Sequence, residues 1–214
     1  MAEPTPQEAK KPWYKNLFVW YFVIGAATLT VLRPFLRREP PPPPVLRHLA
    51  PFELVDQNHK PFSLSDLQDH VWVANFIFTR CGSICPILTR QMAGLQERYE
   101  TYGVDEVKLL SISVDPEYDT PDVLKAYAEL NGADPERWTF LTGDLEAVRA
   151  LVIEGFATGM GEPIENEAGM MDISHTGKFV IVDPSGGIRG YYDSDPEGLD
   201  EVYHRSRHVL NESR

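Results

Sequence analysis

The chain has 214 residues, of which 43% are hydrophobic and 24% are charged, ordinary values for a globular protein with a single core. Its formal net charge is −12, and residues 48–214 carry 13 Lys and Arg against 29 Asp and Glu. This charge balance excludes the basic surface that a nucleic-acid-binding protein shows, so no nucleic-acid partner is expected.

An uncharged apolar run occupies residues 17–32 near the amino end. This run is shorter than the roughly 20 residues that a helix needs to cross a bilayer core, but Trp13, Tyr14 and Phe35 extend the apolar stretch on both sides. No small-residue cleavage site follows the run before Arg33, which disfavours a signal peptide. The sequence thus predicts an N-terminal tail over residues 1–16 and a single transmembrane anchor over residues 17–36. A buried helix is the alternative, and the flanking charges do not set an orientation.

Five consecutive prolines follow at residues 40–44. Such a run adopts the extended polyproline II conformation at about 3.1 Å per residue, so five residues span about 15 Å. The run therefore predicts a stalk over residues 37–50 that spaces the next domain from the anchor. Residues 51–214 are enough for one domain of common size.

The domain shows alternating strand and helix patterns. Two short apolar segments around a polar turn predict a β-hairpin over residues 52–64. Thr120 with Pro121, and Asp144, are expected to begin two of the helices. The other expected elements are strands at 71–78, 107–114, 138–141, 178–183 and 188–192, and helices at 86–102, 121–131, 145–156 and 196–211.

Cys81 and Cys85, the only cysteines, lie between the strand at 71–78 and the helix that follows it. A cysteine pair at this junction of a three-layer α/β sandwich matches the thioredoxin-like plan. Residues four apart share one face of a helical turn, so the sulfurs can form a disulfide or bind one metal ion. The helix amino end should favour thiolate over thiol. A static disulfide is poorly motivated, because so short a loop loses little chain entropy on closure.

His175 is the third candidate, because it precedes the strand at 178–183 at a junction that faces the cysteine turn in a thioredoxin-like arrangement. By itself it would be a loop or capping residue. Two thiolates and an imidazole suit Cu(I), whereas structural zinc usually takes four ligands.

Asp115 and Asp119 could mark a hard-cation site, although capping of their loop is a sufficient explanation. Residues 155–174 are expected to form a functional loop.

At Cys81, Cys85 and His175 and in the segments around them, the chain resembles the Sco/SenC family of copper-binding proteins, which assemble the binuclear copper site of cytochrome c oxidase. The resemblance implies that Cys81, Cys85 and His175 are the ligands of one copper ion, with Cu(I) favoured. The family usually has Pro-Asp-Val between the cysteines, where this chain has Gly82-Ser83-Ile84. The segments that carry the resemblance are 76–86, 113–121, 141–143, and His175 with 179–186.

The resemblance implies a metallochaperone with redox capacity rather than a turnover enzyme. The expected partner is the copper-site subunit of cytochrome c oxidase, which would receive copper or have its cysteines reduced, and an upstream protein would donate the copper. The N-terminal helix would hold the chain in the inner membrane, with the globular domain in the periplasm. Two alternatives stay open: a thiol-disulfide oxidoreductase without metal transport, and a redox or copper sensor. Three residues between the cysteines, rather than the two of thioredoxin-like disulfide enzymes, favour metal binding.

Overall fold

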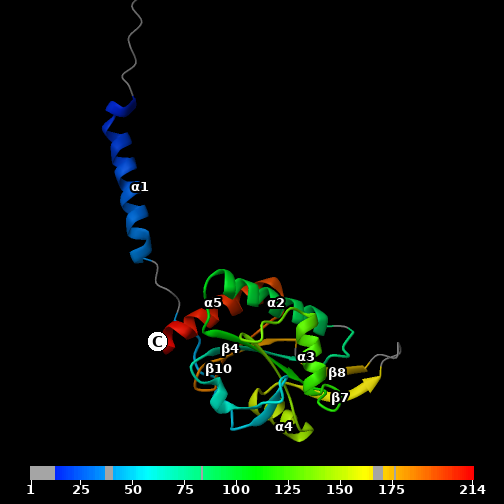
Figure 1. The fold of residues 1–214 in the computed structure, drawn as a ribbon. Coiled ribbons are helices and arrows are strands. Elements are labelled where there is room, and N and C mark those ends of the chain that lie inside the picture. Colours follow the sequence, from blue (N-terminus) through cyan, green and yellow to red (C-terminus); the bar gives the residue numbers. More distant parts are fainter. Residues whose placement is uncertain (1–12, 37–40, 83, 166–170, 176) are drawn as a thin grey trace, which may run out of the picture. The chain divides into compact units, whose positions relative to one another are not determined.

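The computed structural model describes residues 13–36, 41–82, 84–165, 171–175 and 177–214. The chain forms two compact units, which divide between Pro41 and Pro42. The first unit contains a short 3-10 helix at Trp13–Lys15 and helix α1 at Leu17–Leu36 (Figure 1). Within the described ranges, no helix combines the length and the apolar character that crossing a membrane requires. The transmembrane anchor predicted for residues 17–36 is thus not confirmed; the uncharged run inside α1 ends at Arg33 in its last turn.

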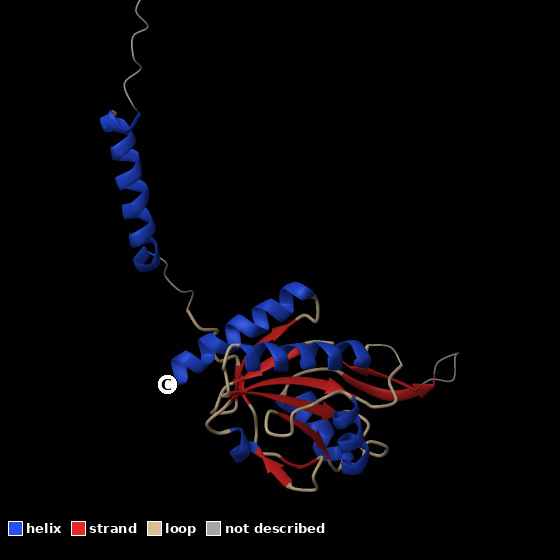
Figure 2. Ribbon diagram, turned by 45° about the horizontal axis from the view of Figure 1, so that its top comes forward, coloured by secondary structure: helices blue, strands red, loops and turns tan. Residues whose placement is uncertain are grey.

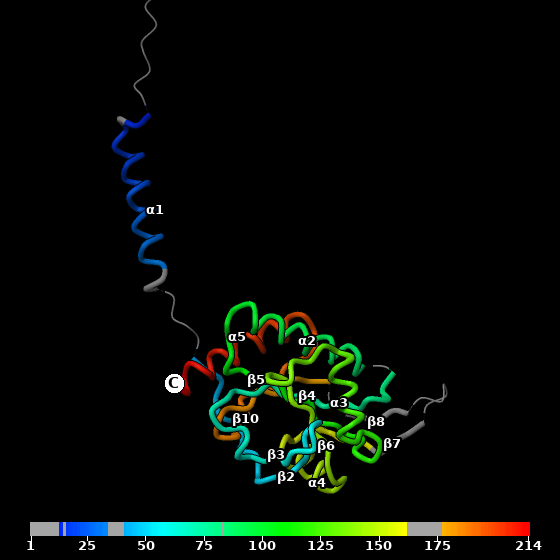
Figure 3. The backbone as a smooth tube through the Cα atoms, viewed as in Figure 1, coloured from blue at the N-terminus to red at the C-terminus, as the bar shows by residue number. Residues whose placement is uncertain are grey.

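The second unit is built on one eight-stranded sheet in the order β1-β10-β9-β4-β5-β6-β2-β3 (Figures 1 and 3). The neighbours β4, β5 and β6 are parallel, and every other pair is antiparallel. The strands are β1 Arg47–His48, β2 Glu53–Asp56, β3 Pro61–Ser63, β4 Val71–Ile77, β5 Val107–Ser113, β6 Trp138–Thr142, β9 Phe179–Val182 and β10 Gly187–Tyr192. The predicted N-terminal hairpin is confirmed as β2 and β3, and β2 extends the sheet beyond β6.

Helices cover both faces of this sheet and give the predicted three layers (Figure 2). They are α2 Cys85–Thr101, α3 Pro121–Leu130, α4 Leu145–Arg149 and α5 Pro196–Ser213. Right-handed crossovers between parallel strands place α2 and α3 on the same face. There Tyr99 of α2 stacks on Tyr203 of α5, with ring centroids 5.4 Å apart. On the other face, Phe156 after α4 packs edge-on against Phe76 of β4 at 5.2 Å.

The apolar strand that leads to the cysteines is the centre of the core. All seven residues of β4 are buried, as expected for a strand covered on both faces. Its side chains pack with those of β5, which lies parallel in the register Val73↔Leu109. The position of the cysteine turn therefore depends on the best-packed strand of the domain.

Capping residues set the helix starts as the sequence predicts. Thr120 Oγ1 accepts a hydrogen bond from the Val123 N–H at 3.4 Å, and the Asp144 carboxylate accepts one from the Glu146 N–H at 2.9 Å. The helix predicted for residues 145–156 differs in its second half, because residues Ala150–Gly155 form a π-helix. That segment turns Leu151, Val152 and Gly155 into the core.

The domain begins before the predicted boundary at residue 51. Arg47 pairs with Ile188 of β10, and the Leu46 N–H donates to the Ile188 carbonyl at 2.8 Å. Arg189 Nε donates to the Pro43 carbonyl at 2.7 Å. Residues from Pro42 onward thus belong to the compact domain rather than to a free stalk, because backbone pairing with β10 holds them.

The segment expected to be a long loop contains a second, two-stranded sheet. Strand β7 at Met160–Glu165 pairs antiparallel with β8 at Met171–His175. The register shifts between Met160 and Pro163, an irregularity that accommodates a proline, which has no N–H for the ladder. The functional loop predicted over residues 155–174 thus contains two paired strands among its described residues.

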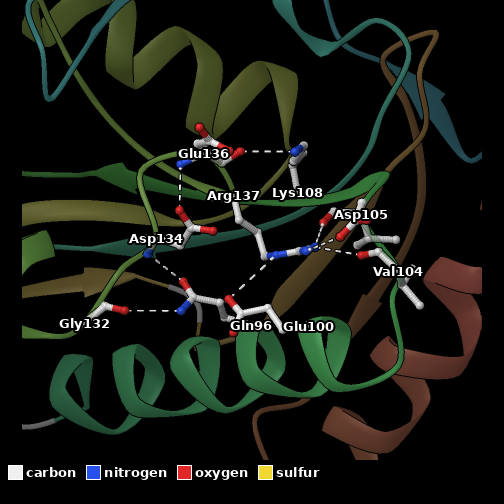
Figure 4. A network of polar contacts seen from close by, with 10 residues as sticks. Gln96, Glu100, Val104, Asp105, Lys108, Gly132, Asp134, Glu136 and Arg137 are labelled. Atoms are coloured by element: carbon white, nitrogen blue, oxygen red, sulfur yellow. Dashed lines mark hydrogen bonds and ion pairs between the residues drawn. The ribbon is translucent and has the colours of Figure 1, made fainter.

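A polar network ties the helix layer to the sheet around Arg137 (Figure 4). Its guanidinium donates to the carbonyls of Val104 and Val107 at 2.7 and 3.0 Å and to the Asp105 carboxylate at 2.9 Å. Gln96 of α2 donates to the Gly132 carbonyl at 3.2 Å. Because Arg137 precedes β6 and Val107 begins β5, this network stabilises the amino ends of these two strands. The cysteine turn lies at the opposite, carboxyl end of the parallel strands.

Candidate metal centre

The cysteines lie where β4 passes into α2, as the sequence predicts. Cys81 follows the turn after Ile77, and Cys85 is the first residue of α2. The Cys81 N–H donates to the Phe78 carbonyl at 3.1 Å, and the Cys85 N–H lies 3.4 Å from the Cys81 sulfur and donates to it. Both thiols are buried, with Cys81 6% and Cys85 1% exposed. The helix start therefore directs a backbone N–H of its first turn at the first sulfur.

Burial reverses the expected effect of the helix start on Cys85. Loss of water raises the pKa of the Cys85 thiol well above its ordinary value, and a hydrogen bond with the backbone of Phe78 opposes the shift only in part. The expectation that the helix start favours thiolate over thiol therefore does not hold at Cys85, because the desolvation cost of a charge exceeds the stabilisation from the nearby dipole.

The raised pKa predicts an unusual pH profile for alkylation of Cys85. An ordinary thiol reacts at a rate that levels off above pH about 8.5. Because the thiolate is the reactive form, we expect the rate at Cys85 to keep rising by about tenfold per pH unit beyond that point. Mass spectrometry of the iodoacetamide-labelled peptide would measure it, with the urea-unfolded chain as the control. A plateau near pH 8.5 in the folded protein would contradict the burial argument.

The backbone next to His175 lies against the cysteine turn. Because β9 runs antiparallel to β4, in the register Ala74↔Val180, the start of β9 lies beside the end of β4. A Cβ added to Gly177 would lie 2.8 Å from Ile84 Cδ1, so residue 177 contacts the spacer between the cysteines. His175 ends β8, two residues earlier. The topology thus brings the backbone of His175 to the end of the sheet where the cysteine turn lies. Its imidazole is not among the side chains that the structure describes.

Two aspartates of the β5–α3 loop hold the cysteine turn, a role that the sequence reasoning missed. Asp119 accepts a hydrogen bond from the Thr79 N–H at 3.0 Å, and Asp115 accepts two from the Arg80 guanidinium at 3.1 and 2.6 Å. The expectation that they cap their loop is wrong for the Asp119 side chain, since Thr120 caps α3. A detectable signal was their place directly after β5, because neighbouring parallel strands end at the same edge of a sheet.

The donors at the turn suit a soft metal. Among the side chains that the structure describes, no group of three or more His, Cys, Asp or Glu could hold a metal ion, and the His175 side chain is not one of them. Two sulfurs four residues apart, where β4 passes into α2, are suitable ligands for Cu(I), which favours thiolate. A third ligand would have to come from the adjacent segment at residues 171–177 or from a partner.

Comparison with known proteins decides the family. The SCO1/SenC family model matches residues 42–211. The chain belongs to the SCO1/SenC family. This SCO1/SenC protein is 33% identical over 151 residues to the SCO1 protein homolog of Bacillus subtilis, with 70% of this chain and 76% of the relative covered. The thioredoxin-like Sco fold predicted from the sequence is thereby confirmed for the globular domain.

Two solved Sco structures resemble the domain. ScoI of Bradyrhizobium japonicum with copper bound has a TM-score of 0.64 at 25% identity, covering 76% of this chain and 99% of that one. BsSco, described as a member of the Sco family of cytochrome c oxidase assembly proteins with a disulfide switch, has a TM-score of 0.67 at 28% identity. That match covers 81% of this chain and 99% of BsSco. Bound copper and a disulfide switch are thus both described for proteins similar to this SCO1/SenC protein.

Proposed function

We propose that the domain carries one copper ion, as Cu(I), on Cys81, Cys85 and His175, and delivers it to the copper-site subunit of cytochrome c oxidase. The observation that carries this proposal is the pair of sulfurs where β4 passes into α2, joined by the Cys85 N–H that donates to the Cys81 sulfur, with Gly177, two residues beyond His175, against Ile84 of the spacer between them. The copper-bound ScoI neighbour and the oxidase-assembly family of BsSco support it.

The chemistry of transfer follows from a three-ligand site. Two thiolates and one imidazole satisfy Cu(I) and leave one side open, so sulfur ligands of the receiving subunit can replace these ligands one at a time. An upstream protein would load the copper by the same exchange in reverse. Copper is the cargo in both steps, so the site must hold it tightly without enclosing it.

A competition titration tests this function. The reduced protein and a His175→Ala variant are titrated anaerobically with Cu(I) against a chelator of known affinity. We expect one tightly bound ion in the wild type and an affinity lower by about tenfold or more in the variant, because the two thiolates supply most of the affinity for a soft ion. No stoichiometric binding in the wild type, or equal binding in the variant, would contradict the proposed ligand set.

The second candidate function is reduction of a disulfide on the same target without copper transport. It is favoured by the contact between the two cysteines and by the disulfide switch of the BsSco neighbour. The raised pKa of Cys85 disfavours this residue as the attacking thiol near neutral pH, because attack on a disulfide requires a thiolate. Reduction of a target peptide disulfide by the copper-free protein would support this candidate instead.

We also propose that α1 anchors the chain in the inner membrane and that the domain faces the periplasm. Large apolar side chains along α1 are exposed, among them Leu17 at 85%, Tyr21 at 79% and Phe22 at 74%, and a helix that is apolar all round needs an apolar environment. Each arginine at a membrane-helix centre costs about 3 kcal/mol. We therefore expect the full chain with Ile24→Arg and Ala27→Arg to leave the membrane fraction in alkaline carbonate. Retention of this variant, or release of the wild type, would contradict the anchor.

A further inference from the structure

The two residues before Cys81 are each held by a different aspartate of the β5–α3 loop. Thr79 donates twice to Asp119, from its N–H to Oδ2 at 3.0 Å and from its hydroxyl to Oδ1. Arg80 donates from Nε and Nη2 to Asp115 Oδ2 at 3.1 and 2.6 Å. Both residues before Cys81 are therefore attached to the loop that follows the neighbouring strand β5.

Asp119 is the more unusual of the two, because its carboxylate is fully buried. It is 0% exposed and also accepts a hydrogen bond from the Ser113 hydroxyl at 2.6 Å. Burial raises its pKa, while the hydrogen bonds from Ser113 and Thr79 lower it. A buried carboxylate is costly unless its oxygens are satisfied, and here both oxygens are used. An asparagine would offer only one acceptor oxygen.

The bonds to Asp119 do not serve the helix that follows it. Thr120 is the N-cap of α3 and accepts from the Val123 N–H. All three described hydrogen bonds to the Asp119 carboxylate come from Thr79 and Ser113. Capping is therefore a poor explanation for this residue.

We propose that Asp119 is a positioning residue for the copper ligands, acting through Thr79 on the backbone that carries Cys81. Both donors of Thr79 are fixed, so the turn holds the Cys81 sulfur where the Cys85 N–H donates to it at 3.4 Å. A turn fixed before the metal arrives loses less conformational entropy on binding, which raises affinity. The assignment rests on the proposed copper function.

Thr79 allows a test that leaves the buried charge in place. Thr79→Val keeps the size and the branching of the side chain but removes the hydroxyl donor, whereas Thr79→Ser retains it. Because a hydrogen bond to a charged group is among the stronger ones, we expect Thr79→Val to weaken Cu(I) binding by about tenfold. Thr79→Ser should restore most of the wild-type affinity. Thr142→Val is the matched control: it makes the same change at a buried residue of β6 whose hydroxyl has no hydrogen-bond partner among the described residues.

Hydrogen exchange gives a readout that does not depend on copper. In the metal-free reduced protein, we expect the Cys81 and Cys85 amides to exchange about tenfold faster in Thr79→Val than in the wild type. The amides of β4 and β5 should keep their protection, which separates a loosened turn from a destabilised fold. Equal protection of the cysteine amides in the two proteins would overturn the positioning role, whatever the copper result.

The copper titration separates the two proposals. A wild type that binds Cu(I) tightly, together with a Thr79→Val variant that binds equally well, would overturn the positioning role and leave the copper function standing. A wild type that fails to bind would instead overturn the copper function. Weakened binding in Thr79→Val but not in Thr142→Val, with faster exchange at the cysteine amides, is the result that supports Asp119 as a positioning residue.

Discussion

Cys81→Ser and Cys85→Ser are each expected to lower the Cu(I) affinity of the reduced protein by more than about 100-fold, since even the outer partners of metal ligands contribute about 10- to 100-fold. A hydroxyl is a hard and weakly acidic donor, whereas Cu(I) prefers thiolate. The loss should therefore exceed that of His175→Ala, which leaves both sulfurs in place. Competition titration with a Cu(I) chelator measures all three variants on one scale.

The two serine variants also need a control for folding. Both cysteines are buried, so a hydroxyl there must find a hydrogen bond or destabilise the turn. Circular dichroism and the thermal midpoint of the metal-free variants show whether the domain is intact. An intact Cys85→Ser protein that binds Cu(I) as tightly as the wild type would show that the start of α2 is not the metal site.

Phe76→Ala is expected to lower the free energy of unfolding by about 3–5 kcal/mol, as large truncations in a core do. Phe76 is fully buried in the central strand β4, and its ring packs edge-on against Phe156. Its loss leaves a cavity between β4 and the segment after α4. Urea denaturation of the domain, followed by fluorescence or circular dichroism, gives the difference in free energy.

Leu130→Ala is the matched control for this truncation. Leu130 is 84% exposed at the end of α3, so its replacement should change the free energy of unfolding by less than about 0.5 kcal/mol. A comparable loss in the two variants would show that the strand before the cysteines is not the packed centre described above.

The predicted losses of Cu(I) affinity and of folding stability both involve β4, because this strand is the centre of the core and also supports the cysteine turn. Its last residue, Ile77, lies only four positions before Cys81. We therefore expect some substitutions in β4 to change copper binding although they replace no proposed ligand. Substitutions in the Arg137 network, at the opposite end of the parallel strands, should change only the free energy of unfolding. Measuring the affinity and the unfolding free energy of each variant distinguishes these two effects.

Local features of the sequence were sufficient for most elements of the domain. The apolar run before Cys81 predicts β4 to within a residue, and Thr120 and Asp144 predict the starts of their helices. These signals are local because strand burial and helix capping depend on neighbouring residues. The same reasoning could not predict the pairing of β7 with β8, which joins residues as far apart in the chain as Met160 and His175.

By itself, the sequence determined the type of chemistry: two soft ligands four residues apart at a strand–helix junction, and a histidine ahead of a later strand. Only the tertiary structure decided that burial raises the pKa of Cys85, that Asp119 and Asp115 hold the cysteine turn, and that residue 177 contacts Ile84. It also placed Pro43 against Arg189 and so included the end of the proline run in the domain. The physical reason is that desolvation and contacts between distant segments arise only when the chain is folded, whereas residue type and spacing are present in the chain before it folds.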